Sequence, residues 1–242
     1  MTGPVTQHDP GKHNADLDLA RGRIIEGGSW KRQRTVVLYP SSKLVPMRVV
    51  HSWLNLMYPP NQPVYRMAVM GTEVGEAYSN AIEQILATPD LKDWEFLLTI
   101  EADNCPPPDG LLLLLKAMEA HPEYSAISGL YWTKGPMGVP QAWGDPTDPV
   151  LNFRPQAPMP GQVMEVCGIG MGFALWRLKT FKDERLRRPW FKTPADEHGV
   201  GTQDLYFAAD ARKYGHRFAV DCSCLVGHWD HEGKFGPAEM MW

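Results

Sequence analysis

The 242-residue chain has little of what marks several large protein classes. No run approaches the ~20 consecutive apolar residues that a membrane-spanning helix needs, and the first residues, MTGPVTQHDPGKHNADLD, lack the apolar centre of a signal peptide. Four cysteines are too few for the disulfide framework of a secreted domain. With 24 Lys and Arg against 28 Asp and Glu, the net charge of -4 disfavours a strongly basic nucleic-acid binder. We therefore expect a cytoplasmic globular protein with no membrane partner.

Familiar catalytic motifs are also missing. The chain holds no Walker A sequence, no GxSxG elbow and no HExxH pair, so the common hydrolase interpretations lack support. The segment EVCGIGMGFALWR is not a dinucleotide fingerprint, because no strand–turn–helix unit with a later ribose-binding acid accompanies it. Its glycines beside a strand still predict a close approach of the backbone to a ligand.

What is present is a regular alternation of expected strands and helices. Residues 1–33 form a polar arm without apolar periodicity, and residues 34–242 form a single domain. The expected strands are TVVLY, VYRMAVM, EFLLTI, SAISGLYW, VMEV, GFALWRLKTF and RFAVDC. The expected helices are VVHSWLNLMY, EVGEAYSNAIEQILA, DGLLLLLKAMEA and Thr202–Tyr214, the last closed by Gly215. This order predicts an α/β fold with a mostly parallel sheet flanked by helices.

The strongest local signal is the abrupt end of the strand EFLLTI in Glu101, Ala102 and Asp103. Ligands of parallel α/β sheets bind beyond the carboxyl ends of the strands, and alternation places the two carboxylates on the same side. Two neighbouring carboxylates are costly unless a cation or a hydrogen-bonding ligand compensates them. A hard divalent ion fits that need. The alternative is that both acids only cap the next helix and accept hydrogen bonds from turn amides.

Asp204 is a candidate general base. It lies in the first turn of an amphipathic helix, where the macrodipole favours an ionised carboxylate. Acids at this position are commonplace, so the position alone favours an ordinary structural role.

His228 follows a strand-like run, where a lone histidine is more often structural than a ligand. The same stretch offers an alternative of a different class, a zinc-stabilised binding module. Cys222, Cys224, His228 and His231 have the residue types of a tetrahedral zinc site, with both sulfurs expected on one strand face. Their spacing is unlike that of a zinc finger.

Taken in order, these segments resemble the GT-A-fold (Rossmann-like) glycosyltransferases, especially family-2-like members, over about Thr35 to His228. TVVLYPSS looks like the first strand and nucleotide-binding turn, and EFLLTIEADNCPPPDGLLLLL looks like the DxD strand with its prolyl exit. GTEVGEAYSNAIEQIL resembles the segment that carries an asparagine before the second helix. EVCGIGMGFALWR is similar to the acceptor-side strand, TQDLYFAADARKYGHRFAVD to the block with the catalytic base, and VGH to the late histidine.

The resemblance implies a metal-dependent transfer of a sugar from a nucleotide-diphosphate sugar, with a UDP-sugar as the leading candidate, to an acceptor hydroxyl. Asp204 would be the base of an inverting reaction, and Asp103, His228 and Glu101 would hold Mn²⁺ or Mg²⁺. The implied donor-binding residues are Pro40, Ser41, Ser42, Thr72, Glu73, Asn80 and Ala102. The implied acceptor-side residues are Gly168, Gly170, Trp132, Trp143 and Gln203. Two departures stand out, Glu101 in place of the first Asp and Gln203 in place of the acid before the base.

The acceptor is open. A transferase without a membrane segment fits a phage or bacterial enzyme, in host cytoplasm in the first case, and a hydroxymethylated DNA base is one candidate beside saccharides, proteins and small molecules. Arg187, Arg188 and Lys192 interleave with an aromatic residue and are candidate phosphate contacts, although a solvated face is the favoured interpretation. A sugar-1-phosphate nucleotidyltransferase is a further alternative, but PSSKLVPMR lacks the glycines that its basic loop needs.

Overall fold

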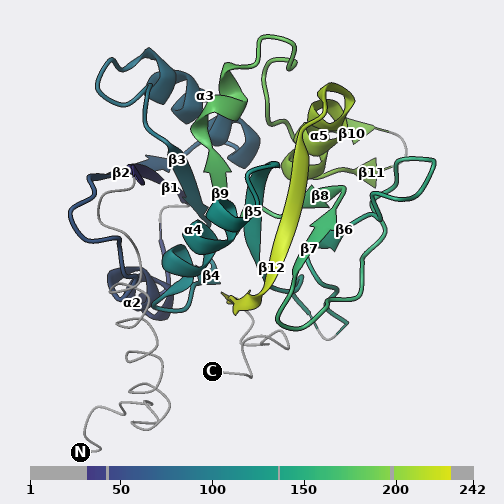
Figure 1. Cartoon of the computed structure of the whole chain (residues 1–242), viewed down its shortest axis with the longest axis horizontal. Helices are drawn as coiled ribbons and strands as arrows, with labels where there is room; N and C mark the ends of the chain where they lie inside the picture. The colour runs from purple at the N-terminus through teal and green to yellow at the C-terminus, as the bar shows by residue number, and fades with distance from the viewer. Residues whose placement is uncertain (1–31, 42–43, 136, 197–198, 230–242) are drawn as a thin grey trace, which may run out of the picture.

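The computed structural model describes residues 32–41, 44–135, 137–196 and 199–229 (Figure 1). The predicted polar arm, residues 1–33, therefore lies almost wholly outside the described residues. Regular structure begins at Thr35, as predicted, and the described chain folds as one α/β domain.

The centre of the domain is a seven-stranded mixed sheet with the order β2-β1-β3-β9-β5-β12-β7. β1 pairs in parallel with β2 and β3, and β12 pairs in parallel with β5. β9 is antiparallel to both β3 and β5, and β7 is antiparallel to β12. Five of the seven strands therefore run in one direction. The bounds are β1 Thr35–Ser41, β2 Val64–Met70, β3 Phe96–Ile100, β5 Tyr124–Leu130, β7 Val163–Val166, β9 Phe173–Arg177 and β12 Arg217–Leu225.

Helices cover both faces of this sheet (Figure 1). Residues of α3 (Val74–Ala87), α5 (Gln203–Ala211) and the 3₁₀ helix η1 (Leu178–Lys182) join the hydrophobic core on one face. α4 (Gly110–Ala120) packs on the other face, where α2 (Met47–Leu54) also contributes an aromatic side chain. The apolar continuity of the central strands follows from this burial on both faces.

The core on the α3 and α5 face is largely aromatic. Trp176 of β9 contacts Phe181, Phe191, Phe207 and Phe218, with ring centroids 5.5–6.1 Å apart. Tilted and edge-on ring pairs of this kind add to the stabilisation from buried area. They join segments that are distant in sequence, and so fix α5 and β12 against the middle of the sheet.

The ends of the helices follow local signals. α2 ends at Leu54, earlier than the predicted run to the prolines at 59 and 60. α5 is followed by the 3₁₀ helix η2 (Arg212–Tyr214) and then by Gly215, whose φ of 85° is the left-handed conformation that glycine adopts readily. The predicted helix over 202–214 is confirmed apart from this tighter last turn.

Short paired segments complete the described fold. They are β4 Asn104–Cys105, β6 Ala142–Trp143, β8 Gly168–Ile169, β10 Ala195–Asp196, β11 Gly199–Val200 and β13 Gly227–His228. β13 pairs with β4, which brings the late histidine segment beside the end of β3. Among the described residues, no helix is long and apolar enough to cross a membrane.

Candidate active site

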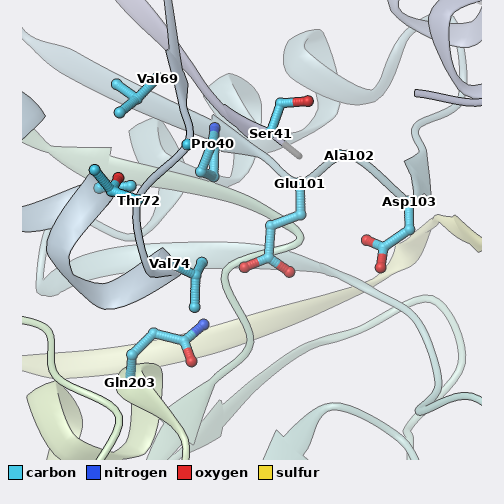
Figure 2. A pocket seen from close by; sticks show the side chains of 11 residues that line it. Pro40, Ser41, Val69, Thr72, Val74, Glu101, Ala102, Asp103 and Gln203 are labelled. Carbon is cyan, nitrogen blue, oxygen red and sulfur yellow. The ribbon is translucent and has the colours of Figure 1, made fainter. Parts of the chain in front are cut away.

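A cavity of about 550 Å³ opens at the carboxyl ends of β1, β2 and β3 (Figure 2). Its volume lies in the range of small-molecule sites, and its position is where parallel α/β sheets bind ligands. The lining residues are Pro40, Ser41, Val69, Gly71, Thr72, Val74, Ala77, Glu101, Ala102, Asp103 and Gln203. Figure 2 shows the Glu101 carboxyl reaching toward Gln203 of α5, with Asp103 beside it.

Asp103 lines the cavity and also contacts a histidine and a lysine. Its Oδ2 lies 3.6 Å from Nε2 of His228 and accepts a 2.5 Å hydrogen bond from Nζ of Lys134. His228 Nδ1 lies 2.6 Å from the carbonyl oxygen of Trp132. A carbonyl only accepts, so Nδ1 carries the proton and, in the neutral ring, Nε2 presents a lone pair toward Asp103. Burial of Asp103 opposes ionisation, but interactions with His228 in its doubly protonated form and with the Lys134 ammonium outweigh it and lower the pKa of Asp103 to about 2.

The donor set of this corner fits a divalent cation. Asp103 Oδ1 is buried and has no hydrogen-bond partner, and a buried carboxylate oxygen without a partner is costly. A histidine whose other ring nitrogen donates to a backbone carbonyl has the orientation typical of metal-binding histidines. The described residues contain no cluster of three His, Cys, Asp or Glu side chains suited to a metal. Two protein ligands suit Mg²⁺-type sites that are completed by phosphate oxygens and water.

Glu101 is turned away from that corner. Its Oε1 accepts a 3.0 Å hydrogen bond from the hydroxyl of Tyr78 on α3. Burial, with added repulsion from Asp103 and Asp204, raises the pKa of Glu101 to about 8, so its carboxyl is neutral at pH 7. A neutral carboxyl is a poor metal ligand. The role predicted for Glu101 in holding the ion, through water or the ribose, stays a prediction, whereas Asp103 and His228 lie together as predicted.

Asp204 lies in the first turn of α5, as predicted, and is almost fully buried. Its Oδ1 accepts a hydrogen bond of 2.8 Å from the amide of Leu205. Burial raises the pKa of Asp204, against hydrogen bonds that lower it. Gln203, rather than Asp204, lines the cavity, but Asp204 is close enough to Glu101 for its charge to act on that carboxyl.

The predicted donor-binding residues divide into two groups. Pro40, Ser41, Thr72 and Ala102 line the cavity, while Ser42 lies outside the described residues. Glu73 instead caps α3, because its carboxylate accepts from the amide of Glu76 and from the hydroxyl of Thr193. Asn80 is exposed on α3 and does not line the cavity. Asp103 and Glu101 do not cap α4, which begins after Asp109 without a side-chain cap.

The predicted acceptor-side glycines are packed against protein instead of facing an open ligand site. A Cβ on Gly168 would lie 2.8 Å from the Leu205 side chain, and one on Gly170 would collide with the Tyr131 hydroxyl. The expectation that these glycines admit a ligand is therefore wrong. The space beside Gly168 is filled by side chains of α5, and the space beside Gly170 is filled by the Tyr131 hydroxyl.

The two predicted acceptor-side tryptophans lie near these glycines. Trp132 supplies the carbonyl that orients His228. Trp143 donates from its indole to the Gln141 side chain at 2.8 Å and pairs with Gly168 in the β6–β8 ladder. Neither tryptophan lines the cavity at β1–β3.

The basic segment is largely engaged within the protein. The guanidinium of Arg187 lies 3.3 Å from the ring centroid of Tyr206 and donates to the carbonyl oxygen of the same residue. Arg188 lies over Trp190 and 3.8 Å from a carboxylate of Glu83. Lys192 is exposed, with its backbone beside the start of α3. These contacts hold Arg187 against the protein, whereas Arg188 and Lys192 are exposed, as expected of a solvated face.

The zinc alternative fails on geometry. The β12–β5 register shifts between Asp221 and Leu225, and this irregularity places Cys222 in one core cluster and Cys224 in the other. Their sulfurs therefore lie on opposite faces of the sheet, contrary to the prediction. The fourth ligand of that site, His231, lies outside the described residues.

Several residues of the site were not predicted. Lys134 follows the strand SAISGLYW, so its place at the carboxyl edge of the sheet is a signal that the sequence did carry. Tyr131 contacts two neighbours of the site: its hydroxyl accepts from the Gly172 amide at 2.8 Å, and its ring meets His228 edge-on. Asn104 is fully buried with both side-chain polar atoms unpartnered, and only tertiary packing reveals this.

Comparison with known proteins supports the fold. No known protein-family model matches the chain, and no curated protein matches it in sequence. The solved structure of A197 from STIV is similar to it, with a TM-score of 0.57 and 18% identity over 84% of this chain and 93% of that chain. At this identity the likeness concerns the fold alone, an α/β domain with a mostly parallel sheet.

Proposed function

We propose that this chain is a metal-dependent glycosyltransferase that moves a sugar from a nucleotide-diphosphate sugar, with a UDP-sugar as the first candidate, to an acceptor hydroxyl. The observation that carries the proposal is the corner at the end of β3. There the unpartnered, buried Oδ1 of Asp103 and the lone pair of His228 Nε2 adjoin a cavity of about 550 Å³. This carboxylate and this imidazole would hold a divalent cation, which would supply the positive charge that a diphosphate in the cavity needs.

Asp103 and His228 would hold Mn²⁺ or Mg²⁺, and the carbonyl of Trp132 keeps the imidazole in the required tautomer. A bound ion would neutralise the diphosphate and stabilise the departing nucleotide. A bound ion would repel Lys134, because both cations would lie beside the same carboxylate, with Lys134 on Oδ2 and the unpartnered Oδ1 left for the ion. The Lys134 ammonium would then be free to meet a phosphate oxygen.

The rest of the cavity suits the nucleoside and the sugar. Pro40, Ser41 and Thr72 line it at the ends of β1 and β2. The neutral carboxyl of Glu101 has a proton to donate, which suits a hydroxyl of the ribose or sugar. Gln203 contributes an uncharged polar group opposite.

Asp204 would act as the base of an inverting transfer. Its raised pKa brings the carboxyl closer to neutral operating pH, where a general base works best. The amide of Leu205 and the side chain of Thr202 both form hydrogen bonds with the Asp204 carboxylate and would hold it in place as it takes the proton from the acceptor hydroxyl.

The acceptor class stays open among a hydroxymethylated DNA base, a saccharide, a protein and a small molecule. The basic segment adds little support for nucleic acid, since Arg187 and Arg188 both have partners within the fold. We place the enzyme in the cytoplasm, or in host cytoplasm if a phage encodes it.

A donor screen by thermal shift tests the proposal. Nucleotide-sugars with Mn²⁺ should raise the melting temperature of the wild type, because a ligand at 100 times its Kd adds about 2.7 kcal/mol to stability. Asp103→Asn should remove the shift, while the exposed acid in Asp93→Asn should leave it intact. Absence of any Mn²⁺-dependent shift across UDP-, GDP-, CDP- and dTDP-sugars would contradict the proposal.

A further inference from the structure

A second cavity, of about 380 Å³, lies at the opposite edge of the sheet. It opens where β5 and β12 begin and β9 ends, whereas the first cavity lies at the carboxyl ends of the parallel strands. Ser125, His216 and Asp183 line it together with the cationic side chains of Arg177 and Lys179. The glycosyltransferase proposal uses none of these residues.

The first three residues form a hydrogen-bonded chain. The hydroxyl of Ser125 lies 2.9 Å from His216 Nδ1, and His216 Nε2 lies 3.1 Å from Asp183 Oδ2. A carboxylate only accepts, so Nε2 of the neutral imidazole carries the proton and Nδ1 accepts from the serine. This is the order of nucleophile, base and orienting carboxylate that activates a serine, with the two ring nitrogens exchanged relative to the chymotrypsin arrangement.

The backbone holds each of the three in place. The β5–β12 register shifts so that Tyr124 pairs with Arg217 and Ala126 with Phe218, which leaves Ser125 as the extra residue of a β-bulge. Bulges re-aim side chains and are frequent beside active sites. The serine is partly exposed to the cavity and is not buried in the sheet.

The base and the acid stand on separate elements. His216 follows the left-handed glycine that ends η2, and its amide donates to the carbonyl of Ala211. Asp183 follows η1, and its amide donates to the carbonyl of Thr180. Hydrogen bonds from Arg185 lower the pKa of Asp183, which keeps the acid ionised and facing the imidazole.

We propose that Ser125, His216 and Asp183 form a second, serine-based site that attacks carboxylic esters. In the first step the Ser125 oxygen bonds to the ester carbonyl carbon, and its proton passes to His216 Nδ1. The carbon–oxygen bond to the leaving alcohol then breaks, and His216 returns the proton to that alcohol. Water repeats the sequence on the acyl-serine and releases the carboxylic acid. Arg177 and Lys179 line the cavity, and their positive charges would favour the developing oxyanion at long range, since the Arg177 guanidinium already donates to the carbonyls of Met118, His121 and Tyr124.

A fluorophosphonate probe tests the nucleophile directly in the full-length protein. Mass spectrometry of the labelled chain should place the adduct on Ser125, and Ser125→Ala should abolish it. Ser223→Ala is the matched control, since Ser223 is an exposed serine that contacts a carboxylate but no imidazole. An adduct elsewhere, or equal labelling of Ser125→Ala, would overturn the proposal.

A cysteine variant at position 125 tests the same activation if the fluorophosphonate is too large for the cavity. In Ser125→Cys, iodoacetamide should alkylate the new thiol at least tenfold faster than it alkylates Ser223→Cys, because an adjacent imidazole favours the thiolate. The four native cysteines are buried and give little background. Adding His216→Asn to Ser125→Cys should remove the advantage. Equal rates for Ser125→Cys and Ser223→Cys would count against an activated position.

Asp183 acts through the histidine and is a positioning residue. Ring ¹⁵N shifts of His216 should report the Nε2–H tautomer in the wild type and lose it in Asp183→Asn. An unchanged tautomer in that variant would remove Asp183 from the proposed site. These measurements involve no metal and no nucleotide-sugar, so their outcome is independent of the glycosyltransferase proposal.

Discussion

Lys134 is a tethered cation at the proposed metal position, and its removal gives a sharp prediction. The ammonium lies 2.5 Å from Asp103 Oδ2, with both side chains partly exposed. A partly exposed ion pair of this kind contributes up to about 1 kcal/mol of free energy. An incoming ion that weakens the pair loses that much of its own binding free energy. Since 1.4 kcal/mol corresponds to a factor of ten in affinity, Lys134→Met should bind Mn²⁺ about fivefold more tightly than the wild type.

Mn²⁺ binding in the absence of nucleotide, followed by electron paramagnetic resonance, measures this effect. Lys134→Arg keeps the charge and should retain an affinity close to that of the wild type. Asp103→Asn should abolish binding both alone and in combination with Lys134→Met. Equal or weaker Mn²⁺ binding by Lys134→Met would refute the view that the lysine and the ion share one carboxylate.

Three further predictions concern the neighbouring structure. Asp204→Asn should keep donor binding but lose transfer. Because burial raises the pKa of Asp204, its contribution to wild-type stability should fall as pH rises from about 4 toward that raised pKa. Glu101, whose pKa is also raised, contributes a fall of the same sign, so urea unfolding of Asp204→Asn should show a smaller fall with pH than the wild type. Gly172→Ala should lower the free energy of unfolding by about 1–3 kcal/mol, since its Cβ would collide with the buried side chain of Asn104; unchanged stability would contradict the packing. Arg187→Ala should cost about 1 kcal/mol in urea unfolding through the lost contact with Tyr206 and leave the salt dependence of any DNA binding unaltered.

Much of the fold could be predicted because its signals are local. Continuous apolar runs mark strands buried on both faces, and Gly215 marks the end of the helical segment that begins after Thr202. The direction of β9 could not be predicted in the same way. FALWR is apolar and buried whether its neighbours run parallel or antiparallel to it, so its direction depends on the long connection that precedes it.

The site residues that come just after the ends of strands could be predicted from the sequence. Asp103, Ala102 and Thr72 follow apolar strands directly, and a parallel sheet gathers such positions at one edge. The turn of the Glu101 carboxyl toward Tyr78 depends on contacts between distant segments, as does the packing of Gly170 on Tyr131.

Local irregularities in strand pairing overturn predictions that are based on strand alternation. The register shift in β12 separates Cys222 from Cys224, although an unbroken strand would place residues i and i+2 on one face. The bulge at Ser125 has the opposite consequence, because it exposes a serine that alternation alone would not distinguish.

The central claim is that Asp103 and His228 bind an ion that serves a nucleotide-sugar. Release of the free nucleotide from each donor, with and without Mn²⁺, tests it most directly, because even slow hydrolysis by water reports the chemistry before the acceptor is known. We predict Mn²⁺-dependent release by the wild type that EDTA stops and that Asp103→Asn and His228→Ala lose. Release at an equal rate in EDTA, or by Asp103→Asn, would contradict the account.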